Sequence, residues 1–212
     1  SIAIGAKRSK VLIPEPYWLS YPEQVALVGG IPQPISMTRS IDEWISLLNS
    51  DVAALVISDP NNPAGSKLSV FDLSKLAQAC DEAGVYLIVD QAYALFGSKE
   101  AESWKPTKLD KVILINSFSK SFGLSGWRVG YAISSRDVIE HLNTINQHLI
   151  TCAPTVLQKI LYENFDSLLD SARCHIAELM LKRDAIKRFC REIGLSYIDS
   201  NQTFYLGLRL FV

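Results

Sequence analysis

Short apolar runs that alternate with amphipathic stretches restrict the fold of this 212-residue chain more than any other feature. Runs rich in valine, isoleucine and leucine are typical of strands buried on both faces, and we expect such strands over residues 52–58, 85–90, 112–116 and 129–134. Between the first two, apolar residues recur at helical spacing over 70–83, and Gly84 is placed to end that helix. This order predicts an α/β fold with a mainly parallel sheet.

Beyond Arg136 the pattern becomes helical. We expect helices over 138–150 and 155–164, and a long helix over 166–193 with one apolar stripe. Residues 203–211 alternate like a final strand. We therefore divide the chain into a first domain, 1–165, and an incomplete second part, 166–212, which consists of an interdomain helix and the start of a small C-terminal domain.

The start of the chain is unusual. Residues 2–4 and 11–13 both resemble strands, but only residues 5–10 separate them. A crossover between parallel strands needs on the order of 10 to 12 residues or more. Either the two strands form a local hairpin, or a segment is missing between Ser9 and Lys10.

Composition narrows the function to small-molecule chemistry. The formal net charge is −1 and the charges are interspersed, which argues against nucleic acid or an anionic membrane as a partner. No apolar run approaches the roughly 20 residues of a membrane span. The four cysteines and three histidines lack the spacing of a metal site, so we expect no metal, reduced thiols and a cytoplasmic protein.

Three polar clusters follow three of the predicted strands, at residues 59–65, 90–93 and 117–120. The carboxyl ends of parallel strands lie along one edge of a sheet, where ligands of such folds bind. We therefore expect the three clusters to converge in one site.

Lys120 and Asp90 are the chemically most informative members of these clusters. Lys120 follows an apolar strand and lies among hydroxyls and glycines. A partly desolvated lysine has a lowered pKa, and its neutral amine can form a Schiff base with a carbonyl. The alternative is an ordinary solvated lysine. Asp90 ends a buried strand, where a carboxylate needs a donor such as a pyridinium nitrogen, unless it only caps the next helix. Tyr93 can turn toward the same ligand or simply pack.

The remaining candidates suit a phosphorylated, flat ligand. Ser117, Ser119 and Arg128 offer two hydroxyls and a guanidinium fork to a phosphate. Ala6 and Lys7, which follow Gly5, can add backbone donors if they begin a helix.

Asn62 and Trp18 are weaker candidates. Asn62 precedes Pro63, whose peptide bond can be cis, in a sharp turn that holds the amide inward. Trp18 can stack on a ring, although most aromatic side chains of this kind belong to a core.

Taken in order, these residues resemble the class I/II aminotransferases, fold-type I enzymes that use pyridoxal 5′-phosphate. The resemblance rests on Pro16-Tyr17-Trp18 with Tyr21, on Pro60-Asn61-Asn62-Pro63-Ala64-Gly65, on Asp90 with Tyr93, and on Ser117-x-Ser119-Lys120 through Gly126-Trp127-Arg128-Val129-Gly130-Tyr131. It implies a three-layer α/β/α domain and a homodimer.

The resemblance also implies a role for each residue. Lys120 would hold the cofactor as a Schiff base and shuttle the α-proton, Asp90 would pair with the pyridinium nitrogen, and Tyr93 and Asn62 would bond the ring's phenolate oxygen. Trp18 would stack on the ring. The phosphate would be bound by Ala6, Lys7, Ser117, Ser119 and Arg128.

The implied reaction moves an amino group from an amino acid to a 2-oxo acid. A β-lyase, a decarboxylase, an oxidase or a non-catalytic relative stays open, because the same cofactor residues serve all of them. The chain departs from the family pattern at Gln91, where most relatives have glutamate. It also lacks the helix after the phosphate loop, the N-terminal arm, and most of the small domain with the arginine that grips the substrate. We therefore expect these residues to be part of a longer protein; alone, they would bind the cofactor weakly and show little activity.

Overall fold

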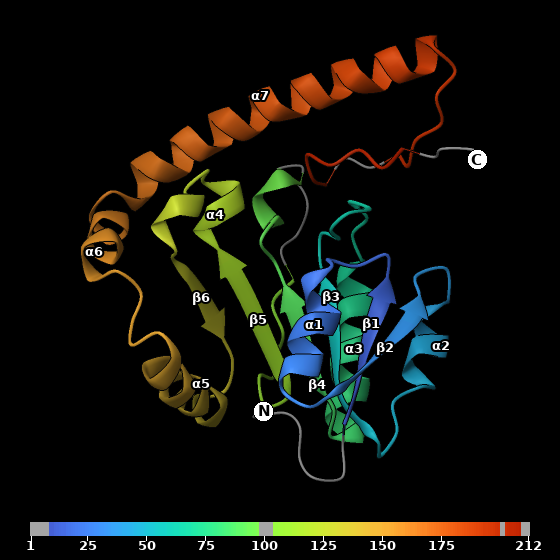
Figure 1. Cartoon of the computed structure of the whole chain (residues 1–212), viewed down its shortest axis with the longest axis vertical. Coiled ribbons are helices and arrows are strands. Elements are labelled where there is room, and N and C mark those ends of the chain that lie inside the picture. The colour runs from blue at the N-terminus through green and yellow to red at the C-terminus, as the bar shows by residue number, and fades with distance from the viewer. Residues whose placement is uncertain (1–8, 98–103, 200–201, 209–212) are drawn as a thin grey trace.

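A twisted sheet forms the centre of the computed structural model, which describes residues 9–97, 104–199 and 202–208 (Figure 1). Six strands pair in the order β2-β1-β3-β4-β5-β6. Their bounds are Lys10–Glu15 (β1), Ile31–Ser36 (β2), Val52–Ser58 (β3), Tyr86–Asp90 (β4), Val112–Ser117 (β5) and Gly130–Ile133 (β6). All pairings are parallel except β5 with β6, which confirms the predicted α/β class.

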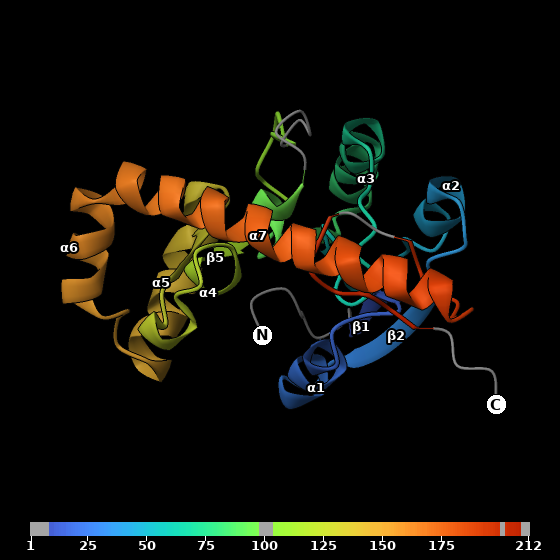
Figure 2. The ribbon, with the colours of Figure 1, turned by 90° about the horizontal axis from the view of Figure 1, so that it is seen from above.

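Helices cover both faces of the sheet, so the molecule has three layers (Figure 2). On one face lie α2 (Ile41–Ile45) and α3 (Val70–Ala83), and Leu73, Leu76 and Cys80 of α3 are buried in the main core. On the opposite face α1 (Ser20–Leu27) packs Tyr21 and Val25 against the sheet. All seven residues of the central strand β3 are buried, as its continuous apolar run predicts.

The predicted helix over 70–83 is confirmed at both ends. The side chain of Ser69 accepts a hydrogen bond from the backbone N–H of Asp72, which caps the first turn. Gly84 follows the last turn with φ 66°, in the left-handed region where glycine is favoured.

β6 differs from its prediction as a buried strand, because all four of its residues are exposed. It pairs antiparallel with β5 and lies at the end of the described sheet. An apolar sequence predicts a strand that other elements cover, but among the described residues no element covers β6.

The second half of the described chain is helical, as predicted. It contains α5 (Arg136–Leu149), α6 (Thr155–Glu163) and α7 (Phe165–Glu192), and α7 crosses above the carboxyl ends of the parallel strands (Figures 1 and 2). Short helical turns follow β4 and β5: η1 (Ala94–Phe96), α4 (Phe118–Ser121) and η2 (Ser125–Trp127). No helix among the described residues is long and apolar enough to cross a membrane.

The strand predicted over 203–211 is wrong for residues 203–208, which form only an isolated bridge between Tyr197 and Leu208. A strand forms only where a neighbouring strand can pair with it. Within the described residues, this segment pairs only with the short stretch of chain just after α7. Residues 2–4 and 209–211 lie outside the described residues. The division of the chain at residue 165 stays a prediction.

Candidate active site

The three polar clusters converge at the carboxyl edge of the sheet, as predicted. β3, β4 and β5 are neighbours in parallel register, with Ser58 opposite Asp90 and Asp90 opposite Ile115. Backbone hydrogen bonds continue beyond the strands, from Asp59 N to Asp90 O (2.9 Å) and from Gln91 N to Ile115 O (2.7 Å). The turns after the three strands therefore form one continuous surface.

Asp90 is held in place by two hydrogen bonds. One carboxylate oxygen accepts from the backbone N–H of Ala92 (3.0 Å), and the other accepts from the hydroxyl of Tyr21 on α1 (2.8 Å). Tyr21 is buried. Its burial is the main cause that raises the pKa of its phenol, and the nearby negative charge of Asp90 is the second. Each carboxylate oxygen still has capacity for a further donor, so the half-buried Asp90 is fixed in orientation and able to accept a ligand N–H.

Trp18 and Asp90 line the same pocket, which lies between α1 and the sheet and has a volume of about 380 Å³. Most of the residues that line it are apolar, and they come from the sheet, including Ile88 and Ile115, and from α1 and its flanks. Trp18 is 42% exposed, and its ring meets the Tyr21 ring edge-on at 5.5 Å between centroids. A flat aromatic surface and one fixed carboxylate in an apolar pocket fit a flat ring that carries a positive nitrogen.

Tyr93 lies deep in an aromatic cluster. It is 3% exposed, and its ring contacts Phe96, Phe204 and Tyr205. Its hydroxyl is 2.9 Å from the hydroxyl of Tyr205, and either group can donate. Burial and this hydrogen bond raise the pKa of the Tyr93 phenol. The ring is thus packed among aromatic side chains, and the hydroxyl has a defined polar partner.

The turn after β3 presents Asn62 at the same edge. The Asn62–Pro63 peptide bond is cis, which the sequence had suggested. The preceding Asn61 is buried and structural: its side chain donates to Pro16 O (3.1 Å) and accepts from Ala64 N (2.9 Å). Asn62 is half-buried beside it, so of the two amides it is the one left for a ligand.

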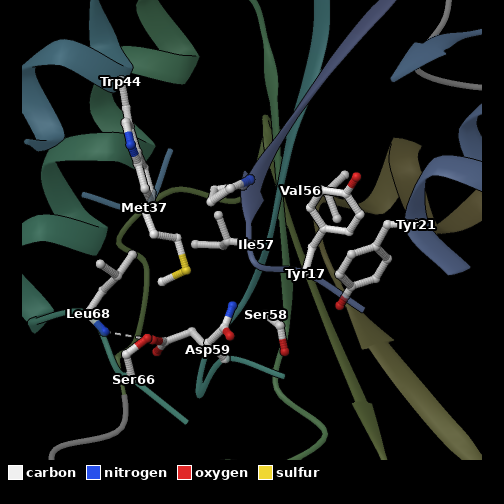
Figure 3. A pocket seen from close by; sticks show the side chains of 12 residues that line it. Tyr17, Tyr21, Met37, Trp44, Val56, Ile57, Ser58, Asp59, Ser66 and Leu68 are labelled. Atoms are coloured by element: carbon white, nitrogen blue, oxygen red, sulfur yellow. Dashed lines mark hydrogen bonds between the residues drawn. The ribbon is translucent and has the colours of Figure 1, made fainter. Parts of the chain in front are cut away.

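Asp59 anchors the other end of this turn (Figure 3). Its carboxylate accepts a 2.7 Å hydrogen bond from the backbone N–H of Leu68, next to a cavity of about 20 Å³ that has room for about one water molecule. Asp59 is 3% exposed, and this burial raises the pKa of its carboxyl to about 6. Sequence reasoning treated Asp59 only as part of a turn and missed this buried acid.

Lys120 lies on α4, directly after β5, and its side chain is exposed. The partial desolvation expected for it is therefore absent, because the single turn of α4 ends at the surface of the described chain. The neighbouring Ser121 is buried and donates to the carbonyl of Ala92 (3.0 Å), which ties α4 to the turn that follows Asp90.

The candidate phosphate ligands lie around α4. The Ser117 hydroxyl accepts from Ser119 N (3.1 Å), and the pairing of Ser117 with Gly130 brings β6 and Arg128 alongside. Arg128 has φ 56°, is exposed, and donates to the carbonyl of Ser125 (3.0 Å). Ala6 and Lys7 lie outside the described residues.

The family model for aminotransferase class I and II matches residues 2–210. The chain belongs to this family. It is 29% identical over 168 residues to the probable aspartate/prephenate aminotransferase of Aquifex aeolicus, and the aligned region covers 74% of this chain and 43% of that protein. It is 31% identical over 163 residues to the aspartate aminotransferase of Bacillus subtilis, and here the aligned region covers 72% of this chain and 42% of that protein.

A solved class I/II aminotransferase has the same fold. The structure of the aromatic aminotransferase from Pyrococcus horikoshii matches with a TM-score of 0.88 and 25% identity, and covers 98% of this chain and 59% of that one. This chain spans about half the length of the curated relatives it matches. The aminotransferase fold predicted from the motifs is thus confirmed.

Proposed function

We propose that this chain is the cofactor-carrying part of a pyridoxal 5′-phosphate-dependent aminotransferase that acts on an amino acid and a 2-oxo acid. One observation carries the proposal beyond family membership: Asp90 is fixed by Tyr21 and Ala92 and lines a pocket with the exposed ring of Trp18. When bound, the cofactor supplies an electrophilic carbonyl and an electron-accepting ring.

The residues of the chain fit the different parts of this cofactor. Asp90 would stabilise positive charge on the ring nitrogen, and Trp18 would cover the ring face. The Lys120 amine would hold the carbonyl carbon and then carry the proton to and from the substrate's α-carbon. The remaining ligands would be Asn62 and Tyr93 for the ring oxygen, and Ser117, Ser119, Arg128, Ala6 and Lys7 for the phosphate.

The substrates and the assembly belong to the same proposal. The relatives carry names that specify aspartate, prephenate or aromatic amino acids, so we propose the class of substrate and no single member. We also propose that the protein forms a homodimer and is located in the cytoplasm. Its chain would consist of a large domain over 1–165 and a small-domain part over 166–212.

The reaction is tested by its dependence on the amino acceptor. The full-length protein that contains these residues, loaded with pyridoxal 5′-phosphate, is incubated with a panel of amino acids, with and without a 2-oxo acid. We expect repeated turnover only when both are present, with the amino group recovered on the acceptor. Repeated turnover without an acceptor would instead indicate elimination, decarboxylation or oxidation. Stable cofactor binding with no reaction for any pair would support the non-catalytic alternative and contradict the proposal.

A further inference from the structure

Tyr205 comes from the far end of the chain to contact the hydroxyl of Tyr93, 112 positions earlier. It lies in the segment after α7, which runs back below that helix toward η1 (Figure 1). The two hydroxyls are 2.9 Å apart, and the two rings lie 5.5 Å apart at 60°. Phe204 packs against both rings and completes the cluster.

The segment that carries Tyr205 is anchored firmly to α7. Arg183 is buried and donates to the carbonyl of Thr203 (2.7 Å), and Thr203 is itself fully buried. The Thr203 hydroxyl in turn accepts from the backbone N–H of Tyr205 (3.2 Å). A second anchor is the ion pair between Lys187 and Asp199. Tyr205 is therefore held to α7, while Tyr93 lies in the turn after β4.

The hydrogen-bond capacity of a phenol gives this contact a specific consequence. Each hydroxyl has one proton and two lone pairs, so only one of the two can donate to the other. When Tyr205 donates, Tyr93 keeps its own proton free for a ligand. Tyr93 is 3% exposed, so bulk water cannot easily take the place of Tyr205 as its partner.

We propose that Tyr205 is a positioning residue: its hydroxyl holds the Tyr93 phenol in one orientation and leaves the Tyr93 proton for the ring oxygen of the cofactor. This inference rests on the proposed function. It assigns a role to a residue outside the motifs on which the sequence resemblance rests, and it links the segment after α7 to the proposed cofactor site.

The test compares Tyr205→Phe, Tyr93→Phe and the double variant, with Tyr197→Phe as a matched control in the same segment. The visible absorbance of bound pyridoxal 5′-phosphate is followed against pH. We expect Tyr93→Phe to raise the midpoint of this titration, and Tyr205→Phe to raise it by about 0.4 to 1 pH unit, the value of one lost neutral hydrogen bond. Tyr205→Phe should add nothing in the Tyr93→Phe background, and Tyr197→Phe should leave the midpoint unchanged.

An unchanged midpoint in Tyr205→Phe, or an equal shift when Tyr93 is already phenylalanine, would overturn the inference, since a packing effect would not need the Tyr93 hydroxyl. Urea unfolding of the same variants without cofactor gives an independent readout. Tyr93→Phe and Tyr205→Phe should each raise the unfolding equilibrium constant about 2- to 12-fold, and the increase in the double variant should be clearly smaller than the product of these two increases. A full product would mean that the two hydroxyls do not interact.

The two readouts separate this inference from the proposed function. If the full-length wild-type protein acquires no cofactor absorbance, the proposed function fails and the positioning role fails with it, even when the unfolding data show an intact pair. If the wild-type chain acquires that absorbance and Tyr205→Phe behaves like wild type, only the positioning role fails.

Discussion

The hydroxyl of Tyr21 donates a 2.8 Å hydrogen bond to the carboxylate of Asp90, so a helix on one face of the sheet fixes the acid at the carboxyl end of β4. Tyr21 is 6% exposed and also packs on Trp18. The α1 layer thus positions both the carboxylate and the aromatic surface that line the pocket between α1 and the sheet. The position of Asp90 at the end of β4 does not by itself fix its carboxylate relative to Trp18; the contacts of Tyr21 with both residues do.

Tyr21→Phe should weaken binding of pyridoxal 5′-phosphate by about 3- to 10-fold, because Asp90 would lose one of the two donors that orient it. The measurement is a fluorescence titration of the chain with the cofactor. Tyr17→Phe is the matched control, since Tyr17 packs against the same core cluster and is not bonded to Asp90. Equal affinities for Tyr21→Phe and wild type would show that Ala92 alone orients the carboxylate.

Asp59 predicts a pH dependence of stability. Burial raises its folded-state pKa from 3.8 to about 6, so between these values the folded protein binds a proton that the unfolded chain does not. Stability should therefore fall as pH rises from about 4 to 7. The shift corresponds to roughly 3 kcal/mol.

Asp59→Asn keeps an oxygen acceptor for Leu68 N and has no charge to bury. Urea unfolding across this pH range should show the variant close to wild type near pH 4 and more stable at pH 7, by up to roughly 3 kcal/mol. A constant difference at all pH values would show that Asp59 does not titrate in this window.

Gly130 controls how closely β6 approaches β5. A Cβ atom at this position would lie 2.7 Å from the carbonyl oxygen of Asn116, whereas a Cβ at Gly126 would meet nothing within 4 Å. Gly130→Ala should lower the free energy of unfolding by about 1–3 kcal/mol, and Gly126→Ala should change it little. Thermal or urea unfolding checks both. Since Ser117 pairs with Gly130, Gly130→Ala should also weaken binding of the cofactor phosphate. Equal stability of Gly130→Ala and Gly126→Ala would contradict the close approach of β6 to β5.

Local sequence signals were sufficient for much of the fold and for the edge at which the site forms. β3 has its predicted bounds because a fully apolar run fits only a central strand, and α3 has its predicted ends because Ser69 and Gly84 cap it. The exposure of β6 and the missing strand at 203–208 were not predictable in the same way, since both depend on which neighbours are present to cover or pair with them.

The partners of the site residues needed the three-dimensional structure. Tyr21 and Asp90 are 69 positions apart, and Tyr93 and Tyr205 are 112 apart, so no local pattern connects either pair. Asp59 is a similar case. A polar residue in a turn is usually solvated, and only the packing of Trp44, Met37 and Leu68 around the cavity shows that this one is buried.

Borohydride reduction tests most directly whether Lys120 holds the cofactor covalently. The chain is incubated with pyridoxal 5′-phosphate, reduced, digested and analysed by mass spectrometry, with Lys120→Ala treated in parallel. Because Lys120 lies on α4 beside the turn after Asp90, the reduced cofactor should be found on the peptide that contains Lys120 and should be absent from the variant. The same label on another lysine, or its retention in Lys120→Ala, would rule out Lys120 as the residue that holds the cofactor.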